Sequence, residues 1–214
     1  RLLDAGCGNG YFSFLACARG LDVLAVSIDR DALRRCEEFR DFRGMSAGRL
    51  RFLPLNLYDL GTLPETFHRI ICLDTLEHIM DDEKVLRLFY DRLEPEGRVV
   101  IGVPNLDCPD FYGEHVSPVE DGRHVRKGYT HPQLEKMLGR VGFTPCARDT
   151  YGGGWTRRAV VAQRRCHDAL ARGLRGRAIQ ALDLASYLAL APLEALDRFS
   201  RAEPLCILVA ATKR

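Results

Sequence analysis

The sequence contains no run of eighteen apolar residues, which is the length that a membrane-spanning helix needs. Its 31 Lys and Arg nearly balance its 29 Asp and Glu, so the net charge of +2 gives no reason to expect nucleic acid as a partner. None of the 8 cysteines forms a Cys-x-x-Cys pair, and their spacing suggests no compact disulfide framework. We therefore predict that they are reduced core residues of a cytoplasmic protein.

The chain also lacks internal repeats and low-complexity segments. Its 214 residues, 46% of them hydrophobic and 28% charged, can bury a substantial core. We predict a single domain over residues 1–214, with a helical insertion at about 155–203. Arg1 is not an initiator methionine and an apolar strand begins at once, so we expect that a preceding segment is missing.

Apolar runs alternate with segments of helical period, which is typical of a parallel sheet with crossover helices. The predicted strands are Leu2–Ala5, Val23–Ile28, Arg51–Leu55, Arg69–Leu73, Arg98–Val103, Thr144–Thr150 and Leu205–Ala211. The predicted helices are Tyr11–Arg19, Arg30–Phe42, Asp82–Leu93 and Pro132–Val141, and Thr130 is a plausible N-cap for the last of them. The predicted fold class is α/β, a doubly wound seven-stranded sheet.

The first strand runs into glycines at alternate positions, Gly6, Gly8 and Gly10, and Asp29 closes the next apolar run. Glycines allow close backbone approach to a ligand, and the helix that follows points unpaired N–H groups at the same place. A carboxylate that ends the neighbouring strand can accept both hydroxyls of a ribose. The pattern predicts a nucleotide-cofactor site. Tyr11 stands where the dinucleotide fingerprint has its third glycine, which argues against a dinucleotide.

The opening stretch instead resembles the first motif of class I S-adenosylmethionine-dependent methyltransferases, acidic-x-Gly-x-Gly-x-Gly, with Asp4 as the acidic residue. Later stretches keep the register of this family. Asn56 stands where the family ends its third strand, and the stretch around Leu73 resembles the fourth strand of its ubiquinone-pathway and small-molecule members. The resemblance spans about residues 1–143. It implies a Rossmann-like fold whose last strand is antiparallel, S-adenosylmethionine as cofactor, and methyl transfer to a small molecule, with an oxygen as the expected acceptor atom.

The resemblance also implies roles for individual residues. The cofactor-binding residues would be Asp4, Gly6, Gly8, Gly10, Asp29, Asn56, Leu57 and Leu73. Asn56 would contact the adenine edge, Leu57 would pack on the ring, and the backbone of Leu73 would touch the methionine end. Two structural alternatives stay open, because Asp29 can cap the following helix and Asn56 can be a turn residue.

A hydroxyl acceptor must lose its proton, and histidine is the usual base near neutral pH. His78, His115 and His124 follow predicted strands at the carboxyl edge of the sheet, where open α/β folds place ligands. We take His124 and His78 as the catalytic candidates, with His124 favoured. For each of them the alternative is an ordinary hydrogen bond to a backbone carbonyl.

Asp74, Glu77 and His78 resemble the Glu-x-x-Glu-His element of ubiquinone-pathway and small-RNA methyltransferases, in which a divalent cation can orient the acceptor oxygen. Mg²⁺ or Mn²⁺ would suit these ligands, with His115 or His124 as a further one. Many small-molecule relatives use no metal here, so we assign no metal ligand. RNA as substrate ranks low, because no aromatic residues are interleaved with basic ones.

The insertion from Trp155 to Glu203 is rich in arginine in its first half. A solvated helix face and a surface for an anionic acceptor or membrane are the two interpretations of that half. The second half, from Ile179 to Phe199, predicts a helical cover over the pocket, with a dimer contact as the alternative. Two alternative functions also stay open, an NAD-dependent oxidoreductase and a non-catalytic cofactor-binding module.

Overall fold

The computed structural model describes residues 1–108, 116–170, 197–200 and 202–214. It contains one seven-stranded sheet in the order β3-β2-β1-β4-β5-β7-β6. The strands are β1 (Leu2–Ala5), β2 (Val23–Ser27), β3 (Leu50–Pro54), β4 (Phe67–Leu73), β5 (Leu93–Pro104), β6 (Phe143–Tyr151) and β7 (Cys206–Lys213). Strand β7 pairs antiparallel with both β5 and β6. The predicted fold class, with its antiparallel last strand, is confirmed.

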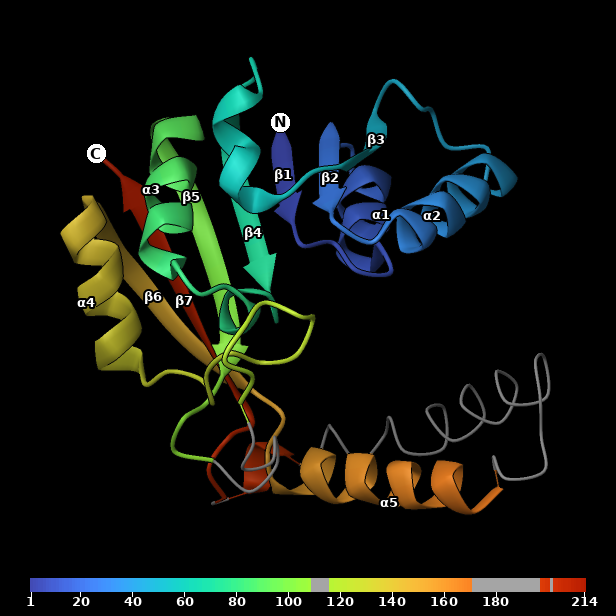
Figure 1. The fold of residues 1–214 in the computed structure, drawn as a ribbon, viewed down its shortest axis with the longest axis vertical. Helices are drawn as coiled ribbons and strands as arrows, with labels where there is room; N and C mark the ends of the chain where they lie inside the picture. Colours follow the sequence, from blue (N-terminus) through green and yellow to red (C-terminus); the bar gives the residue numbers. More distant parts are fainter. Residues whose placement is uncertain (109–115, 171–196, 201) are drawn as a thin grey trace.

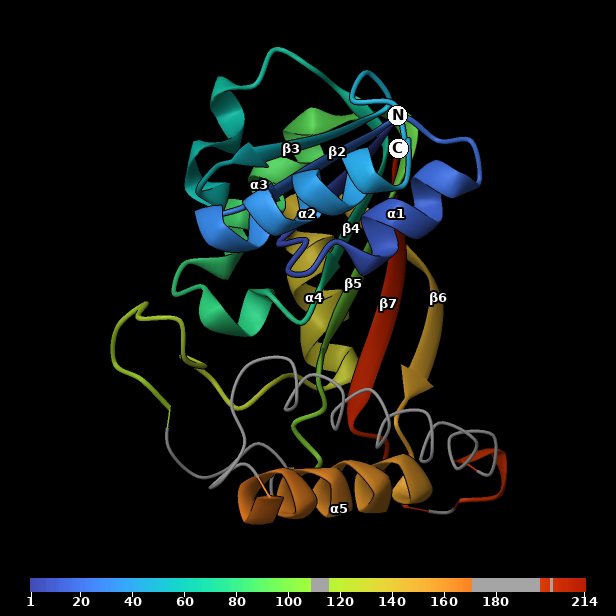
Figure 2. The same ribbon diagram turned by 90° about the vertical axis from the view of Figure 1, so that its right-hand side faces the viewer.

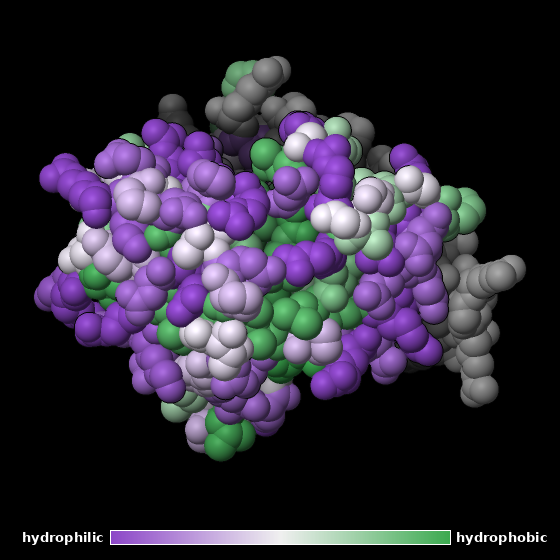
Figure 3. Space-filling model, turned by 90° about the horizontal axis from the view of Figure 1, so that it is seen from above, coloured by the Kyte–Doolittle hydropathy of each residue, from purple (hydrophilic) through white to green (hydrophobic). Residues whose placement is uncertain are grey.

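Helices cover both faces of this sheet (Figures 1 and 2). Helices α1 (Tyr11–Ala18) and α2 (Arg30–Phe42) lie on one face, whereas α3 (Asp82–Arg92) and α4 (His131–Val141) lie on the other. Short 3-10 helices η1 (Leu57–Thr62) and η2 (Leu76–His78) follow β3 and β4. Figure 3 shows the end of the molecule at the amino ends of the parallel strands, where hydrophilic residues predominate and apolar ones appear between them.

The alternation of side chains along β1 explains why two cores form. Leu3 and Ala5 pack into the larger core with α3 and α4, whereas Leu2 packs into the smaller core under α1 and α2. All four residues of β1 are buried, as expected for a central strand covered on both faces. The carboxyl ends of β1, β2, β3 and β4 therefore meet at one edge, with the loops that follow them exposed there.

Most helix boundaries follow the sequence signals. Thr130 caps α4 in a reciprocal capping box with Gln133, and Gly142 ends that helix at a φ of 110°. Strand β5 departs from the prediction, because it starts at Leu93 and not at Arg98. Leu93 pairs with Phe67 across a register shift, so the expected turn is a bulge within the strand, with Glu96 at a φ of 61°.

Helix α5 (Gly154–Leu170) opens the predicted insertion and crosses below the carboxyl ends of the strands in both ribbon views. Asp197, in the short helix η4 (Asp197–Phe199), accepts hydrogen bonds from the backbone N–H groups of Gly153, Trp155 and Thr156. This carboxylate therefore caps the start of α5 from a distant part of the chain. The predicted cover over 179–199 lies almost wholly outside the described residues.

The cysteine prediction is wrong at one position. Cys146 is exposed on β6, whereas Cys7, Cys17, Cys36, Cys72, Cys108 and Cys206 are buried thiols. The side chain of Cys166 lies outside those that the structure describes. Within the described ranges, none of the helices is both long and apolar enough to cross a bilayer.

Candidate functional site

The turn between β1 and α1 contains three positions that only glycine can occupy without backbone strain. Gly6, Gly8 and Gly10 have φ values of 84°, 52° and 75°. A Cβ on Gly6 would lie 2.2 Å from the hydroxyl oxygen of Thr75, so the loop after β4 packs directly on the turn. The hydroxyl of Thr75 in turn donates to the carbonyl of Leu73 at 2.9 Å. The turn and the end of β4 thus form one rigid edge.

A pocket of about 480 Å³ opens beside this edge, within the usual range of small-molecule sites. Its lining combines residues at or after the carboxyl ends of β1 to β4 with two from the loop after β5: Gly6, Gly8, Ser27, Ile28, Asp29, Leu55, Asn56, Leu57, Tyr58, Asp74, Thr75, His78, Ile79, Val85, Glu120 and Gly122. Five of the eight predicted cofactor residues, Gly6, Gly8, Asp29, Asn56 and Leu57, are therefore brought together by the fold. Leu57, Ile79 and Val85 supply apolar walls.

Asp29 and Asn56 each have a structural role in addition to lining the pocket. Oδ1 of Asp29 accepts from the backbone N–H of Ala32 at 2.9 Å and caps α2. Oδ1 of Asn56 accepts from the N–H of Tyr58 at 3.0 Å and caps η1. Both structural alternatives, a helix cap at Asp29 and a turn residue at Asn56, are therefore observed. They leave the second oxygen of Asp29 and the amide nitrogen of Asn56 to face a ligand.

Three predicted cofactor residues, Asp4, Gly10 and Leu73, lie outside the pocket lining. Asp4 is 4% exposed and its carboxylate accepts from the hydroxyl of Ser13 at 2.5 Å. Burial raises the pKa of Asp4 to about 6, and the hydrogen bond from Ser13 partly offsets this effect. The hydrogen bond from Ser13 therefore joins the end of β1 to α1. Asp4 can stabilise the turn in this way without contacting a ligand in the pocket.

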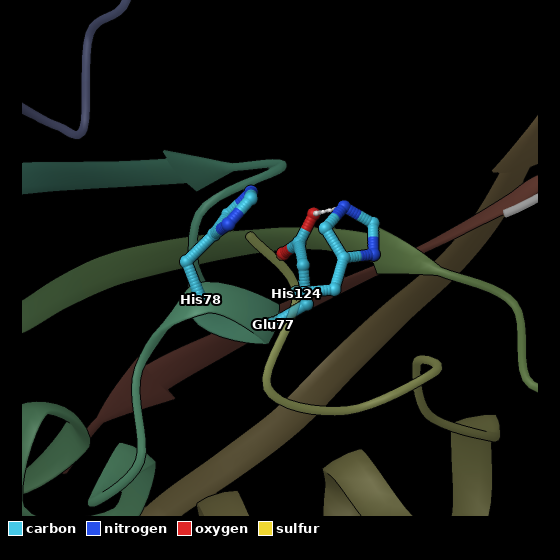
Figure 4. A group of neighbouring side chains, drawn as sticks. All are labelled: Glu77, His78 and His124. Carbon is cyan, nitrogen blue, oxygen red and sulfur yellow. Dashed lines mark ion pairs between the residues drawn. The ribbon is translucent and has the colours of Figure 1, made fainter. Parts of the chain in front are cut away.

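Figure 4 shows a cluster of Glu77, His78 and His124, here called the Glu77 cluster, of which His78 lines the pocket. One ligand atom from each residue lies within 4.8 Å of the others, and Oε1 of Glu77 is 4.0 Å from Nε2 of His124. The two imidazole rings meet edge to face with centroids 4.7 Å apart. The backbone N–H of Val125 donates to the Glu77 carbonyl at 2.9 Å and holds the two loops together.

Burial controls the protonation of this cluster. Glu77 is 1% exposed, and burial raises its pKa to about 8, so its carboxyl group is largely protonated at neutral pH. Burial and the neighbouring His78 lower the pKa of His124, which is therefore neutral at pH 7. A neutral imidazole at the edge of the pocket can accept a proton.

The cluster also has the donor chemistry of a cation site. Within the part of the chain that the structure describes, Oε2 of Glu77 and Nδ1 of His78 are buried without a hydrogen-bond partner. Two imidazoles and a carboxyl group that loses its proton on binding suit a divalent transition metal such as Mn²⁺. Three ligand atoms within 4.8 Å of one another can bind a single ion once their side chains close to bonds of about 2.0–2.3 Å. The residues present therefore fit such an ion.

Asp74 does not join the cluster. Its two oxygens accept from the hydroxyl of Tyr151 at 2.9 and 3.0 Å, and its backbone has a φ of 47°. Tyr151 belongs to β6, far along the chain, and no local sequence signal pointed to it. Glu120 and Thr75 line the pocket without having been predicted, because no local sequence signal indicated them either. His115 lies outside the described residues.

The strand order and the pocket beside the glycine turn define the Rossmann-like methyltransferase fold. The model of the methyltransferase domain family matches residues 1–147, and the chain belongs to this family. S-adenosylmethionine is the cofactor of its class I members, as the opening motif predicted. A structure of an S-adenosylmethionine-dependent methyltransferase from Archaeoglobus fulgidus superposes with a TM-score of 0.63 at 19% identity, covering 100% of this chain and 86% of that chain.

Among curated proteins, an uncharacterized protein from Synechococcus is 35% identical over 99 residues, which cover 45% of this chain and 24% of that protein. The mitochondrial ubiquinone biosynthesis O-methyltransferase of Schizosaccharomyces pombe is 28% identical over 101 residues, or 47% of this chain and 36% of that enzyme. The matched part of the chain thus spans less than half the length of these curated relatives.

Proposed function

We propose that this protein transfers a methyl group from S-adenosylmethionine to an oxygen of a small-molecule acceptor. The observation that carries the proposal is the charge of the pocket. Asp29, Asp74 and Glu120 line it, and none of its described lining residues is Lys or Arg. A cofactor with a sulfonium and an ammonium group is stabilised there, whereas the pyrophosphate of NAD would be repelled.

The roles within the pocket follow from its layout. The apolar walls formed by Leu57, Ile79 and Val85 suit the adenine ring, and the oxygen of Asp29 that does not cap α2 suits the ribose hydroxyls. Gly6 and Gly8 let the backbone approach the methionine part closely. Asp4, through its buried carboxylate, and Gly10 and Leu73, through their backbone, would support this arrangement from outside the pocket lining.

The sulfonium group supplies an activated methyl, so the protein must chiefly align the acceptor and exclude water. A new O–CH₃ bond forms as the S–CH₃ bond breaks, and the acceptor hydroxyl gives up its proton. His124, kept neutral by its surroundings, is the proposed base, and His78 packs against it and limits its orientation. Oxygen as acceptor is supported by the name of the Schizosaccharomyces pombe relative.

A divalent cation in the Glu77 cluster is a second candidate role for the same side chains. Glu77, His78 and His124 would hold the ion, which would orient the acceptor oxygen and lower the pKa of its hydroxyl. The base role of His124 and the cation role exclude one another, because a metal-bound imidazole nitrogen cannot take a proton. Chelation distinguishes them.

Calorimetric titration with S-adenosylhomocysteine tests the proposal. Asp29→Asn keeps an oxygen for the α2 cap but loses the charge, and should weaken binding by at least about tenfold, the worth of one hydrogen bond to a charged group. Asp31→Asn, an exposed acid in the same helical turn, is the matched control and should bind like the wild type. Binding that Asp29→Asn leaves unchanged, or a preference for NAD, would refute the assignment.

A further inference from the structure

The end of the pocket near Asn56 has a polar rim, of which the sequence indicated only Asn56 itself. Its residues are Asn56 at the end of β3 and Glu120 from the loop that precedes α4. We propose that Glu120 accepts a hydrogen bond from the 6-amino group of the cofactor's adenine and so determines specificity for adenine. The inference rests on the proposed function and extends it to a residue outside the methyltransferase motifs.

One oxygen of Glu120 is fixed by two donors from different elements. Oε1 accepts from the hydroxyl of Tyr58 at 2.6 Å and from the backbone N–H of Met80 at 2.5 Å. Tyr58 lies in η1 and Met80 follows η2, next to Ile79 in the apolar wall. These two hydrogen bonds therefore hold the carboxylate between η1 and the segment that follows η2, although Glu120 is an exposed residue.

The loop that carries Glu120 is itself held against the pocket. Arg126 donates to the carbonyls of Ile79 and Met80, at 2.5 and 2.8 Å, and pairs with the carboxylate of Asp82. Further contacts join the loop to η2, including the Val125 to Glu77 backbone hydrogen bond. Glu120 thus reaches the pocket from a preorganised loop, which reduces the entropy lost when a ligand binds.

Acceptor capacity favours Glu120 over Asn56 as the contact to an amine. The single carbonyl oxygen of Asn56 already accepts from the Tyr58 N–H. A carboxylate has about four acceptor positions, and the two recorded donors to Glu120 both use Oε1. The 6-amino group of adenine is a donor that a carboxylate can accept, whereas unsubstituted purine offers no donor at this position and keeps N1 as an acceptor.

The test compares two ligands that differ at this position alone, S-adenosylhomocysteine and its 6-deamino analogue, in which unsubstituted purine replaces adenine, by calorimetric titration of the full chain. The wild type should prefer the adenosyl ligand by about thirtyfold, the size expected for a hydrogen bond to a charged acceptor. Glu120→Gln keeps an oxygen for Tyr58 and Met80 but adds an amide donor, so the preference should fall to within about threefold. Asp121→Asn, at the next position, is the matched control and should keep the wild-type ratio.

The outcomes separate this inference from the proposed function. If the wild type binds neither ligand, the proposed function itself is wrong. If it binds the adenosyl ligand and Glu120→Gln keeps the wild-type ratio, Glu120 does not contact the amine. If Glu120→Gln weakens both ligands equally, the residue acts on the loop alone, and the specificity role is overturned.

Discussion

Replacing Glu77 with glutamine should change how the stability of the protein depends on pH. Its carboxyl group has a pKa of 4.5 when exposed and about 8 in the fold, where burial favours the protonated form. The unfolded chain binds fewer protons than the folded chain between these values, so the wild type loses stability as pH rises through this window. At about 1.36 kcal/mol per pH unit, the loss attributable to Glu77 amounts to about 4 kcal/mol between pH 5 and 9.

Glu77→Gln removes this loss because a neutral amide of the same shape does not titrate. Urea denaturation at pH 5, 7 and 9, in the presence of a chelator, measures the free energy of unfolding of both proteins. The variant should be similar to the wild type at pH 5 and increasingly more stable above it. Asp4, which titrates in both proteins, cancels in the difference. A stability difference that stays constant from pH 5 to 9 would refute the burial argument.

Three further predictions concern the turn, α4 and the Glu77 cluster. Gly6→Ala should impair folding or abolish S-adenosylhomocysteine binding in calorimetry, because the new Cβ would lie 2.2 Å from Thr75. Gly8→Ala should cost only about 1 kcal/mol of backbone strain, because its Cβ would meet nothing within 4 Å. Thr130→Ala should lower the free energy of unfolding by about 1 kcal/mol in urea, since it removes the α4 capping box. Exhaustive chelation should leave methyl transfer unchanged if His124 is the base, and activity restored by Mn²⁺ would assign the cluster to a cation.

The framework of the fold was predictable because its signals are local. Strand β1 and helix α2 have the boundaries that hydrophobic periodicity predicted, and the Thr130 cap of α4 was visible as a residue pattern. The predicted start of β5, Arg98, lies after the observed start, Leu93, because Pro95, Glu96 and Gly97 are typical turn residues. Pairing of Leu93 with Phe67 overrides that local preference and turns the expected break into a bulge.

The glycine turn, the carboxylate of Asp29 and the alternating order of strands and helices could be predicted from the sequence, since each depends on residues close together in the chain. The distant side chains that meet them are brought there by the folding of the whole sheet and its loops. This folding joins Tyr151 to Asp74, His124 to Glu77 and Glu120 to Tyr58. Such contacts depend on how loops cross the carboxyl edge of the sheet, and long-range packing leaves no periodic or spacing signal in a single sequence.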